Sequence, residues 1–476
     1  MDAHEIRNSY LAFLEKNGHT VIDRAPLVPR GDTSTLFNGS GMQSLLPFLL
    51  GEEHPAGKRL VDSQPCVRAQ DIDDVGDNRH TTFFEMLGNW SLGDYFKETQ
   101  IRQFFTFLVD VVGLDPENIY VTCFIGDPAN GIPRDDEAAG IWQQVFAERG
   151  ISNGIAEIGS QADGDARGVK PGERIFFYDG GENWWSRGGS LEGTPIGDPC
   201  GPDSEVFYDF GADKQDASYG LAHPASDGGQ FMEIGNQVFM QYRRLDDGSF
   251  EELARRNVDF GGGLERIAAA SLGSDDVFRI SLLWPIIESL QALTGRRYED
   301  ETAAMRIIAD HLRGATFLAV DGVRPSNKEQ GYVMRRLLRR AIRLALSLGL
   351  SENFFSVVVP VIADLYADDY PEVAAQRDEV IAVLVKEENA FRRTLDGGLQ
   401  TLADWEGEII TGQDVFRLSD TYGFPKELSV EEARRLGITV SDDWEDAFAA
   451  SLEEQRARSR GATRLGAAGL PGGAAS

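Results

Sequence analysis

The sequence is poor in cysteine. Of its 476 residues only Cys66, Cys123 and Cys200 are cysteines, and they lie far apart. Three scattered thiols cannot form the framework of paired cysteines on which small secreted domains depend. They also contain no C-x-x-C pair, the spacing that many structural zinc sites use. We therefore expect reduced cysteines, no disulfide and no zinc site in this chain.

Long hydrophobic runs are also missing. Although 42% of the residues are hydrophobic, no segment reaches the ~18 consecutive apolar residues that a membrane helix needs. Residues 1–19 contain no basic stretch followed by an apolar one, so they do not predict a signal peptide. Apolar residues from Ile6 to Leu14 instead recur at helical spacing, with Gly18 after them as a helix end. We expect a cytoplasmic globular protein that makes no membrane contact.

Positive charge is scarce. The chain has 46 Lys and Arg residues against 77 Asp and Glu residues, which gives a net charge of −31 at pH 7. Phosphate contacts need positive potential, so this balance argues against a general nucleic-acid binder and against DNA as a partner. One segment differs, because residues 324–343 contain seven basic residues and the single acid Glu329. RNA binding is compatible with the net charge only on such a concentrated basic surface.

The residue pattern divides the chain into two main parts. Up to about residue 275, short β-like runs alternate with glycine-rich loops, which is typical of a mostly antiparallel sheet with helices packed on it. The clearest runs are residues 118–126, 173–179, 204–210 and 230–244. Long helical patterns dominate after that point. We predict an α+β domain over residues 1–275, a helical domain over 276–460 and a disordered, glycine-rich tail over 461–476.

Three segments of the first part contain residue types that bind a nucleotide. In residues 66–96, Arg68 precedes a polar loop and an aromatic run. Such an arginine can hold a phosphate in a bidentate manner, and Phe83 or Phe84 can stack on a base. Taken alone, a surface arginine beside a pair of core phenylalanines is the better interpretation of this segment.

The second segment is the apolar strand that Glu233 and Asn236 interrupt, and their buried polar groups need partners. In the third, residues 257–270, a strand ends at Asp259 and three glycines lead into a helix that carries Arg266. Free backbone N–H groups at a helix N-terminus, together with an arginine, suit a triphosphate. A glycine run before a helix is weak support by itself, so the three segments have to be weighed together.

Together the segments resemble a known family. HTTFFEMLGNWSLGDYF, followed far downstream by GGGLER, is similar to the second and third signature segments of class II aminoacyl-tRNA synthetases. The strings FFEMLGN…GDYFK, DPCGPDSEVFYD, NQVFMQ, GVRPSNKEQGYVMRRLLRRA and FRLSDTYGFP resemble alanyl-tRNA synthetases specifically, in that family's order. The resemblance implies the class II fold, an antiparallel sheet with flanking helices, followed by a helical tRNA-recognition domain. It also implies ATP-dependent activation of alanine and its transfer to the 3′ end of tRNA(Ala).

Roles at the nucleotide site follow from this resemblance where residues match. Arg68 and Arg266 take the positions of the family's catalytic arginines, which contact the ATP α-phosphate and the outer phosphates. Phe84 takes the position that stacks on adenine, and Arg79 and Glu233 are assigned to ATP binding with it. Mg²⁺ that neutralises the pyrophosphate is expected, and acids such as Glu233 could help to place it. No dedicated metal ligands are assigned.

The same resemblance places the amino acid. Asp259 would pair with the ammonium group of alanine, and Asn236 would fix its orientation. The pocket for the methyl group would be lined by Met42, Trp185, Val238 and Gly261. A single buried carboxylate that faces an amine is a sensible specificity device.

For tRNA, the resemblance implies recognition of a G·U wobble pair in the acceptor stem. Asn327 and Asp420 match the family's asparagine and aspartate that recognise this pair. An amide and a carboxylate suit base edges in the wide minor groove of RNA. Arg335 and Arg339 form one i,i+4 column on a helix, and a second arginine column lies one residue further on. One column is expected to contact phosphate, while the other is equally well explained as a solvated face or as pairs with the protein's own acids.

The sequence departs from the family's pattern in three places. AQDIDDVG replaces the usual GGKHND stretch, Gly235 replaces a tryptophan and Gly262 replaces a methionine. Nothing after residue 460 resembles the family's editing domain, with its zinc ligands, or its C-terminal domain. We therefore expect a natural split form or a truncated product, without editing activity and without zinc.

Two other functions are alternatives to a tRNA synthetase. One is a paralogue that makes alanyl-adenylate but loads a carrier protein. The presence of Asn327 and Asp420 argues against it, because loading a carrier requires no recognition of a wobble pair. The other is a non-catalytic tRNA-binding paralogue, whose signal would be the loss of Arg68, Asp259 or Arg266. All three are present.

Overall fold

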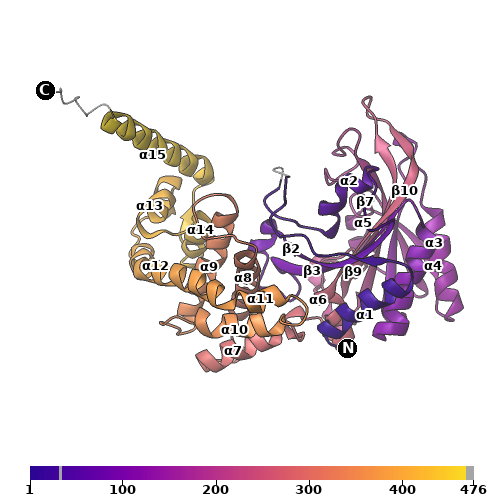
Figure 1. Cartoon of the computed structure of the whole chain (residues 1–476), viewed down its shortest axis with the longest axis horizontal. Helices are drawn as coiled ribbons and strands as arrows, with labels where there is room; N and C mark the ends of the chain where they lie inside the picture. Colours follow the sequence, from indigo (N-terminus) through magenta and orange to yellow (C-terminus); the bar gives the residue numbers. More distant parts are fainter. Residues whose placement is uncertain (32–34, 468–476) are drawn as a thin grey trace.

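The structure is a computed structural model that describes the backbone of residues 1–31 and 35–467, with side chains up to residue 458. A large sheet with its covering helices forms one end of the molecule, and a group of helices forms the other (Figure 1). The last strand of the large sheet ends at residue 263. The change from sheet to helices therefore falls close to the change in residue pattern near residue 275.

One sheet occupies the centre of the first part. Its strands are β1 (Thr20–Val21), β2 (Arg59–Val67), β3 (Phe83–Leu92), β4 (Ile119–Phe124), β5 (Gly154–Gly159), β6 (Glu173–Tyr178), β7 (Trp184–Trp185), β8 (Pro199–Asp209), β9 (Phe231–Arg244) and β10 (Phe250–Gly263). Their order across the sheet is β1-β2-β3-β10-β9-β8-β4-β6-β5, and β7 pairs with β8 outside this path. Pairing is antiparallel from β2 to β4 and parallel at both ends of the sheet. The prediction of a mostly antiparallel sheet with flanking helices is confirmed.

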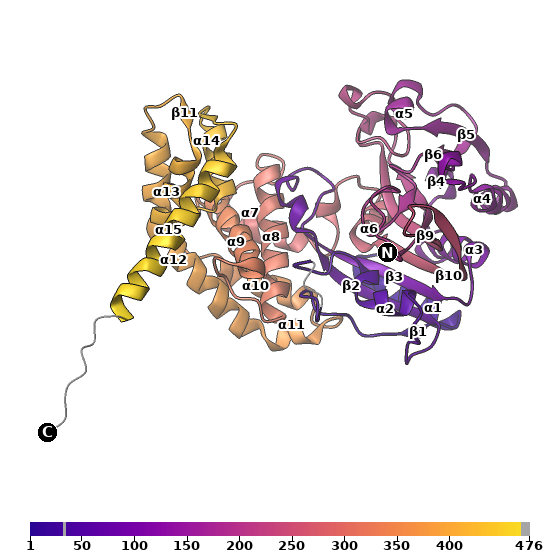
Figure 2. The same ribbon diagram turned by 90° about the horizontal axis from the view of Figure 1, so that it is seen from above.

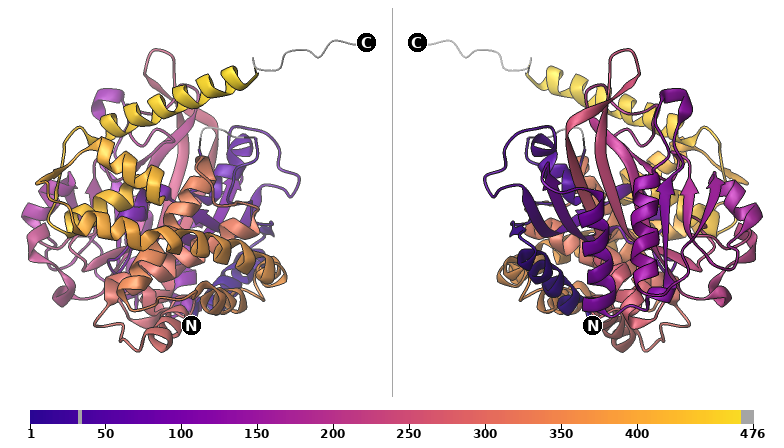
Figure 3. Two further views of the ribbon diagram at one scale, coloured as in Figure 1. Left: turned by 90° about the vertical axis from the view of Figure 1, so that its left-hand side faces the viewer. Right: turned by 90° about the vertical axis from the view of Figure 1, so that its right-hand side faces the viewer.

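Long helices cover one face of this sheet, and the short helical segment of residues 41–49 packs on part of the other face. The covering helices include α1 (Ala3–Lys16), α3 (Lys97–Thr106), α4 (Asp136–Glu148) and α6 (Leu264–Leu272), as Figures 2 and 3 show. Phe260 of β10 packs on this side against Tyr10 and Phe104, with ring centroids 6.3 and 4.4 Å apart. Because side chains alternate along a strand, Asp259 and Gly261 point to the opposite face.

Helix α1 forms where its sequence predicts it. The Asp2 side chain accepts a hydrogen bond from the Glu5 backbone N–H, and the Glu5 carboxylate accepts one from the backbone N–H of Asp2. This reciprocal capping box satisfies N–H groups that the first turn leaves unpaired. Ile6, Tyr10 and Leu14 are buried, so the apolar stripe found in the sequence faces the sheet.

The second part is helical, as predicted. It contains α7 (Trp284–Thr294), α8 (Thr302–Val320), α9 (Glu329–Ser347), α10 (Phe355–Leu365), α11 (Pro371–Ala375), α12 (Arg377–Ala403), α13 (Gly412–Tyr422), α14 (Lys426–Arg435) and α15 (Trp444–Ala467). Helix α8 is its core, because every residue from Ile307 to Val320 is buried. A short parallel pair of strands, β11 (Ile409–Ile410) and β12 (Thr439–Val440), lies beside α14.

The last helix extends into the predicted disordered tail, residues 461–476. We expected disorder from residue 461, yet α15 continues to Ala467. The physical reason is composition: alanine, arginine and leucine are good helix formers, and they offset the glycines of this stretch. Residues 468–476, the rest of the predicted tail, lie outside the described residues.

Across the part of the chain that the structure describes, no helix has both the length and the apolar character needed to cross a membrane.

A network of buried charges joins the two parts. Arg7 of α1 donates from Nε to Glu85 of β3 (2.7 Å), and Arg313 of α8 donates to Glu265 of α6 (2.8 Å). The backbone N–H of Glu85 donates to the Glu265 carboxylate (3.1 Å), and the Tyr370 hydroxyl donates to Glu85 (2.8 Å). All five side chains are buried. Each of the two glutamates directly adjoins, in sequence, a residue predicted to bind ATP.

Candidate functional site

A small pocket lies on the face of the sheet opposite the long helices, where β3, β9 and β10 meet the start of α6. Its volume is about 110 Å³. All five residues predicted to bind ATP line it: Arg68, Arg79, Phe84, Glu233 and Arg266. They come from segments far apart in the sequence, so the sheet is what brings them together.

Arg68 follows the last residue of β2 and is held from two sides. Its Nε donates to the backbone oxygen of Gly39 (3.1 Å), and its guanidinium carbon lies 4.9 Å from the centre of the Phe84 ring. Among the described residues, its two Nη groups donate to no protein atom. A guanidinium fixed in this way offers both Nη groups to a phosphate.

Two further arginines line the pocket. Arg266 donates from Nη1 to the Glu233 carboxylate (3.2 Å) and to the Glu233 backbone oxygen (3.1 Å). Arg79 forms no ion pair within the described residues, and burial, followed by the nearby charge of Arg266, lowers its pKa. Three guanidinium groups line the pocket together with three carboxylates, of which Glu233 pairs with Arg266 and Glu265 pairs with an arginine of α8. The other two guanidinium groups of the pocket form no ion pair among the described residues and are free to hold a polyphosphate.

The glycine run is not the helix-opening loop that the sequence predicted. β10 continues through it, and α6 begins only at Leu264. Gly261 pairs with Gly88 on one side and with Asn236 on the other, so its backbone belongs to the sheet and forms no phosphate cradle. The glycine is needed for space instead, because a Cβ atom at position 261 would lie 2.7 Å from the Met86 sulfur. The arginines are the groups of this pocket whose charge suits a phosphate.

Apolar side chains gather next to this pocket on the same face. Met42, Trp90 and Val238 belong to one buried cluster, and Trp185 packs against it. Trp184 belongs to a different cluster, on the other side of β7. The fold therefore places Trp185, and not Trp184, beside the other residues predicted to line the methyl pocket.

Asp259 lies at the base of this apolar region. The Trp90 indole Nε1 donates to its Oδ1 (2.7 Å), and its side chain is buried. Burial raises the pKa of Asp259 to about 7, while the hydrogen bond from Trp90 acts in the opposite direction. An ammonium group beside this carboxylate would favour its ionised form.

Asn236 lies between Asp203 and Glu205. Its Nδ2 is 3.3 Å from Asp203 Oδ2 and 3.5 Å from Glu205 Oε1, and its Oδ1 is buried without a partner among the described residues. Burial raises the pKa of Asp203 to about 7 and that of Glu205 well above its usual value. Asp203 pairs with Val238, which pairs in turn with Asp259, so these acids line one side of the site.

A groove in the helical part contains the four residues predicted to bind tRNA. Its volume is about 740 Å³, and its lining comes mainly from α9, α13 and α15; Figure 2 shows how these helices are arranged. It is lined by Asn327, Arg335, Arg339 and Asp420. Arg335 donates to the amide oxygen of Asn327, and Asp420 accepts a hydrogen bond from Gln455 of α15 (2.5 Å).

Both arginine columns of α9 are paired with carboxylates. Arg335 and Arg339 share Glu387 of α12, at 3.1 and 2.5 Å. The second column pairs with acids from the sheet part and from α14: Arg336 with Asp73 (2.6 Å) and Arg340 with Glu431 (3.0 Å). From the sequence, pairing with the protein's own acids is one explanation for one of the two columns. In the structure, both columns are paired in this way. A phosphate that approaches α9 has to compete with these carboxylates.

Sequence reasoning did not single out Trp90, Asp203 or Glu205. All three lie in strings quoted for the family resemblance, but only the register of the strands shows that they face the site. His80 lines the nucleotide pocket as well, and its hydrogen bond to Asp77 raises the pKa of the imidazole.

An antiparallel sheet with helices behind it, and in front a site built from arginines of separate segments, is the architecture of class II aminoacyl-tRNA synthetases. The family model described as "tRNA synthetases class II (A)" matches residues 5–468. The Alanine--tRNA ligase of Treponema pallidum (strain Nichols) is 40% identical over 486 residues, covering 98% of this chain and 74% of that protein. The Alanine--tRNA ligase of Hydrogenovibrio crunogenus is 38% identical over 476 residues, covering 98% of this chain and 50% of that protein. This chain belongs to the alanyl-tRNA synthetase family.

The matches cover nearly all of this chain but only part of each relative. This chain spans half the length of the Hydrogenovibrio protein and about three quarters of the Treponema protein. The class II fold and the family predicted from the sequence are confirmed.

Proposed function

We propose that this chain activates alanine with ATP and transfers it to the 3′ end of tRNA(Ala). The observation that supports this most is that a pocket and an apolar cluster with a buried carboxylate lie side by side on one face of the sheet. The pocket is lined by Arg68, Arg79 and Arg266. The apolar cluster contains Trp90, whose indole donates to the buried carboxylate of Asp259. Gly261 lines the arginine pocket and lies two residues after Asp259 on β10, so both face the same side of the sheet, and a phosphate and an amino acid bound there would meet.

In the first step, an oxygen of the alanine carboxylate would attack the α-phosphorus of ATP. The bond between that phosphorus and the bridging oxygen breaks, and pyrophosphate leaves with the electron pair. Arg68 and Arg266 would hold the phosphates and stabilise the charge that develops on them. Asp259 would hold the ammonium group, which aims the carboxylate at the phosphorus. Phe84 would stack on the adenine.

In the second step, a hydroxyl of the terminal ribose of tRNA would attack the carbonyl carbon of alanyl-adenylate. The bond from this carbon to the phosphate oxygen breaks, and AMP leaves. The groove that contains Asn327 and Asp420 would hold the acceptor stem during this transfer. Transfer needs this groove, whereas activation does not.

Mg²⁺ would be held mainly by the phosphates of ATP. Within the described residues, no three His, Cys, Asp or Glu side chains come together as a metal cage. This suits an ion that keeps much of its water and binds through one or two carboxylates plus substrate phosphates. Glu233, on the pocket wall beside Arg266, is the carboxylate placed to contact it. When bound, the ion would neutralise charge on the pyrophosphate.

The test is alanine-dependent exchange of pyrophosphate into ATP, followed by charging of tRNA(Ala) with labelled alanine. Both activities are expected. Exchange without charging would instead favour loading of another acceptor, and absence of both in a folded protein would favour the non-catalytic alternative.

Removal of the groove's polar groups should affect transfer alone. Asn327→Ala and Asp420→Ala should leave pyrophosphate exchange unchanged, because both residues lie in the helical part. Each should weaken charging by roughly 1–3 kcal/mol, the size of a lost base contact. The measurement is kcat/KM for tRNA(Ala) with the wobble pair and for a variant with G·C at that position. If wild-type protein charges both tRNAs equally, the recognition role is wrong.

Alanine binding should depend on pH with a midpoint near 7. Burial holds the pKa of Asp259 at about 7, so the carboxyl is protonated below this pH and cannot pair with an ammonium group. We expect KM for alanine in the exchange reaction to be about tenfold higher at pH 6 than at pH 8. The pKa of Asp203 is also about 7, so Asp203→Asn is the matched control. The midpoint should persist in that variant, and its loss would assign the titration to Asp203.

A further inference from the structure

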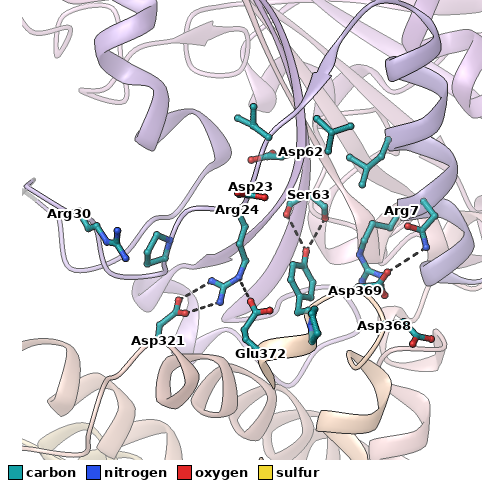
Figure 4. Close-up of a pocket in the computed structure, with 17 residues that line it drawn as sticks. Arg7, Asp23, Arg24, Arg30, Asp62, Ser63, Asp321, Asp368, Asp369 and Glu372 are labelled. Carbon is teal, nitrogen blue, oxygen red and sulfur yellow. Dashed lines mark hydrogen bonds and ion pairs between the residues drawn. The ribbon is translucent and has the colours of Figure 1, made fainter. Parts of the chain in front are cut away.

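A second cavity, of about 660 Å³, lies at the edge of the sheet, between its first strands and the helical part (Figure 4). It shares no residue with the nucleotide pocket. β1 pairs with β2 only as far as Val61, so beyond this residue the edge of β2 is uncovered, and Asp62 and Ser63 line the cavity. The opposite wall consists of residues 368–372 and Asp321.

Most charges in the cavity wall are paired with one another. Arg24 donates to Asp321 and to Glu372, at 2.8 Å each, and Arg7 donates to Asp369, as the dashed lines of Figure 4 show. These pairs hold the two walls together. Neither guanidinium reaches the remaining acids of the cavity.

Asp62 is different. Its side chain is 3% exposed, its Oδ1 has no hydrogen-bond partner, and no basic side chain pairs with it among the described residues. Asp23 lines the same cavity, as Figure 4 shows. Asp23 also has no ion-pair partner within the described part of the chain. A buried carboxyl without a partner is unfavourable, and burial accordingly raises the pKa of Asp62 well above its usual value.

We propose that this cavity binds an aliphatic diamine or polyamine, with one ammonium group against Asp62. Ammonium is the simplest group that can donate hydrogen bonds to this carboxylate and also neutralise it. A bare metal ion fits less well, because no three potential ligand side chains come together in the described residues. Leu11, Ile22 and Pro371 give the cavity apolar surface for methylene groups, and Asp23 is placed for a second ammonium group.

The test is calorimetric titration of the full chain with 1,4-diaminobutane and with spermidine at about 0.15 M salt, which screens surface attraction. The uncharged 1,4-butanediol is the matched ligand control and should not bind. Asp62→Asn keeps the shape of the side chain and removes its charge, and we expect affinity for both amines to fall about tenfold or more. Asp23→Asn should give a smaller loss, because Asp23 is exposed.

A control is needed because a net charge of −31 attracts polycations to any part of the surface. Asp404→Asn removes an exposed carboxylate at the end of α12, away from the cavity, and should bind both amines as the wild type does. Equal binding by wild type and Asp62→Asn, or no saturable binding of either amine, would overturn the proposal.

A second variant tests the cavity itself. Val21→Trp places a large side chain in the cavity wall at an exposed position of β1 and should also abolish saturable binding, while pyrophosphate exchange, which uses the other pocket, stays unchanged. Retained saturable binding of spermidine by Val21→Trp would place the amine site elsewhere.

Discussion

Replacing Arg68 or Arg266 by alanine should lower the rate of alanine-dependent pyrophosphate exchange about 10²–10³-fold, the usual effect of removing one preorganised group that stabilises a charged transition state. Arg68 is positioned by Gly39 and by the Phe84 ring, and Arg266 by Glu233. Each offers its charge to the pocket with little need to reorganise. The measurement is kcat for exchange at saturating alanine and ATP.

The matched control for both variants is Arg297→Ala. Arg297 lies on the surface and pairs only with its neighbour Asp300 in the described structure, so exchange should not change. Arg68→Lys keeps the charge but loses the planar pair of donors, and it should recover only part of the rate. Near-normal exchange by Arg68→Ala or Arg266→Ala would remove that arginine from the proposed mechanism.

Arg313→Met should lower the free energy of unfolding by about 3–5 kcal/mol, the typical effect of breaking a buried ion pair from one side. Arg313 is fully buried and donates to Glu265 (2.8 Å) and to the backbone oxygen of Phe83 (2.5 Å). Without it, the Glu265 carboxylate keeps its buried position but loses its cation. Urea denaturation followed by circular dichroism measures the change.

Two variants show whether the loss comes from the unpaired charge. Arg297→Met breaks an exposed pair and should change stability by less than about 0.5 kcal/mol. The double variant Arg313→Met with Glu265→Leu removes both charges and should regain part of the lost stability. A double variant as unstable as the sum of the single ones would mean that the two residues act independently.

Local sequence patterns predicted the elements of the fold well. The strand predicted over residues 230–244 is β9 within one residue, because its apolar and aromatic side chains suit a strand that is largely buried. The glycine run was misassigned for a physical reason. Glycine is suited to a loop that opens a helix, and also to a strand position against which another side chain packs closely. Only the position of Met86 shows that Gly261 is the second kind.

Residue types and family resemblance predicted the residues of the candidate site. They did not predict the ion pairs and hydrogen bonds that these residues form. The spacing of Arg335 and Arg339 predicted one column on a helix face. It could not reveal Glu387, which pairs with both arginines from another helix. In the same way, the hydrogen bond between Trp90 and Asp259 depends on the register of β3 against β10. Such contacts follow from tertiary packing, so no local pattern contains them.

The pairing of the α9 arginines also has a consequence for how RNA binding would respond to ionic strength. A phosphate contact ordinarily gains affinity because it releases condensed counterions, and affinity then falls steeply as salt rises. The arginines of α9 are already paired with carboxylates of the protein. A phosphate that binds there would displace a carboxylate, so fewer ions would be released than at an unpaired arginine. The affinity for RNA should therefore depend less on salt concentration than the seven basic residues of 324–343 would suggest. A shallow slope of log affinity against log salt, well below that for seven independent phosphate contacts, would be the thermodynamic signature of this exchange.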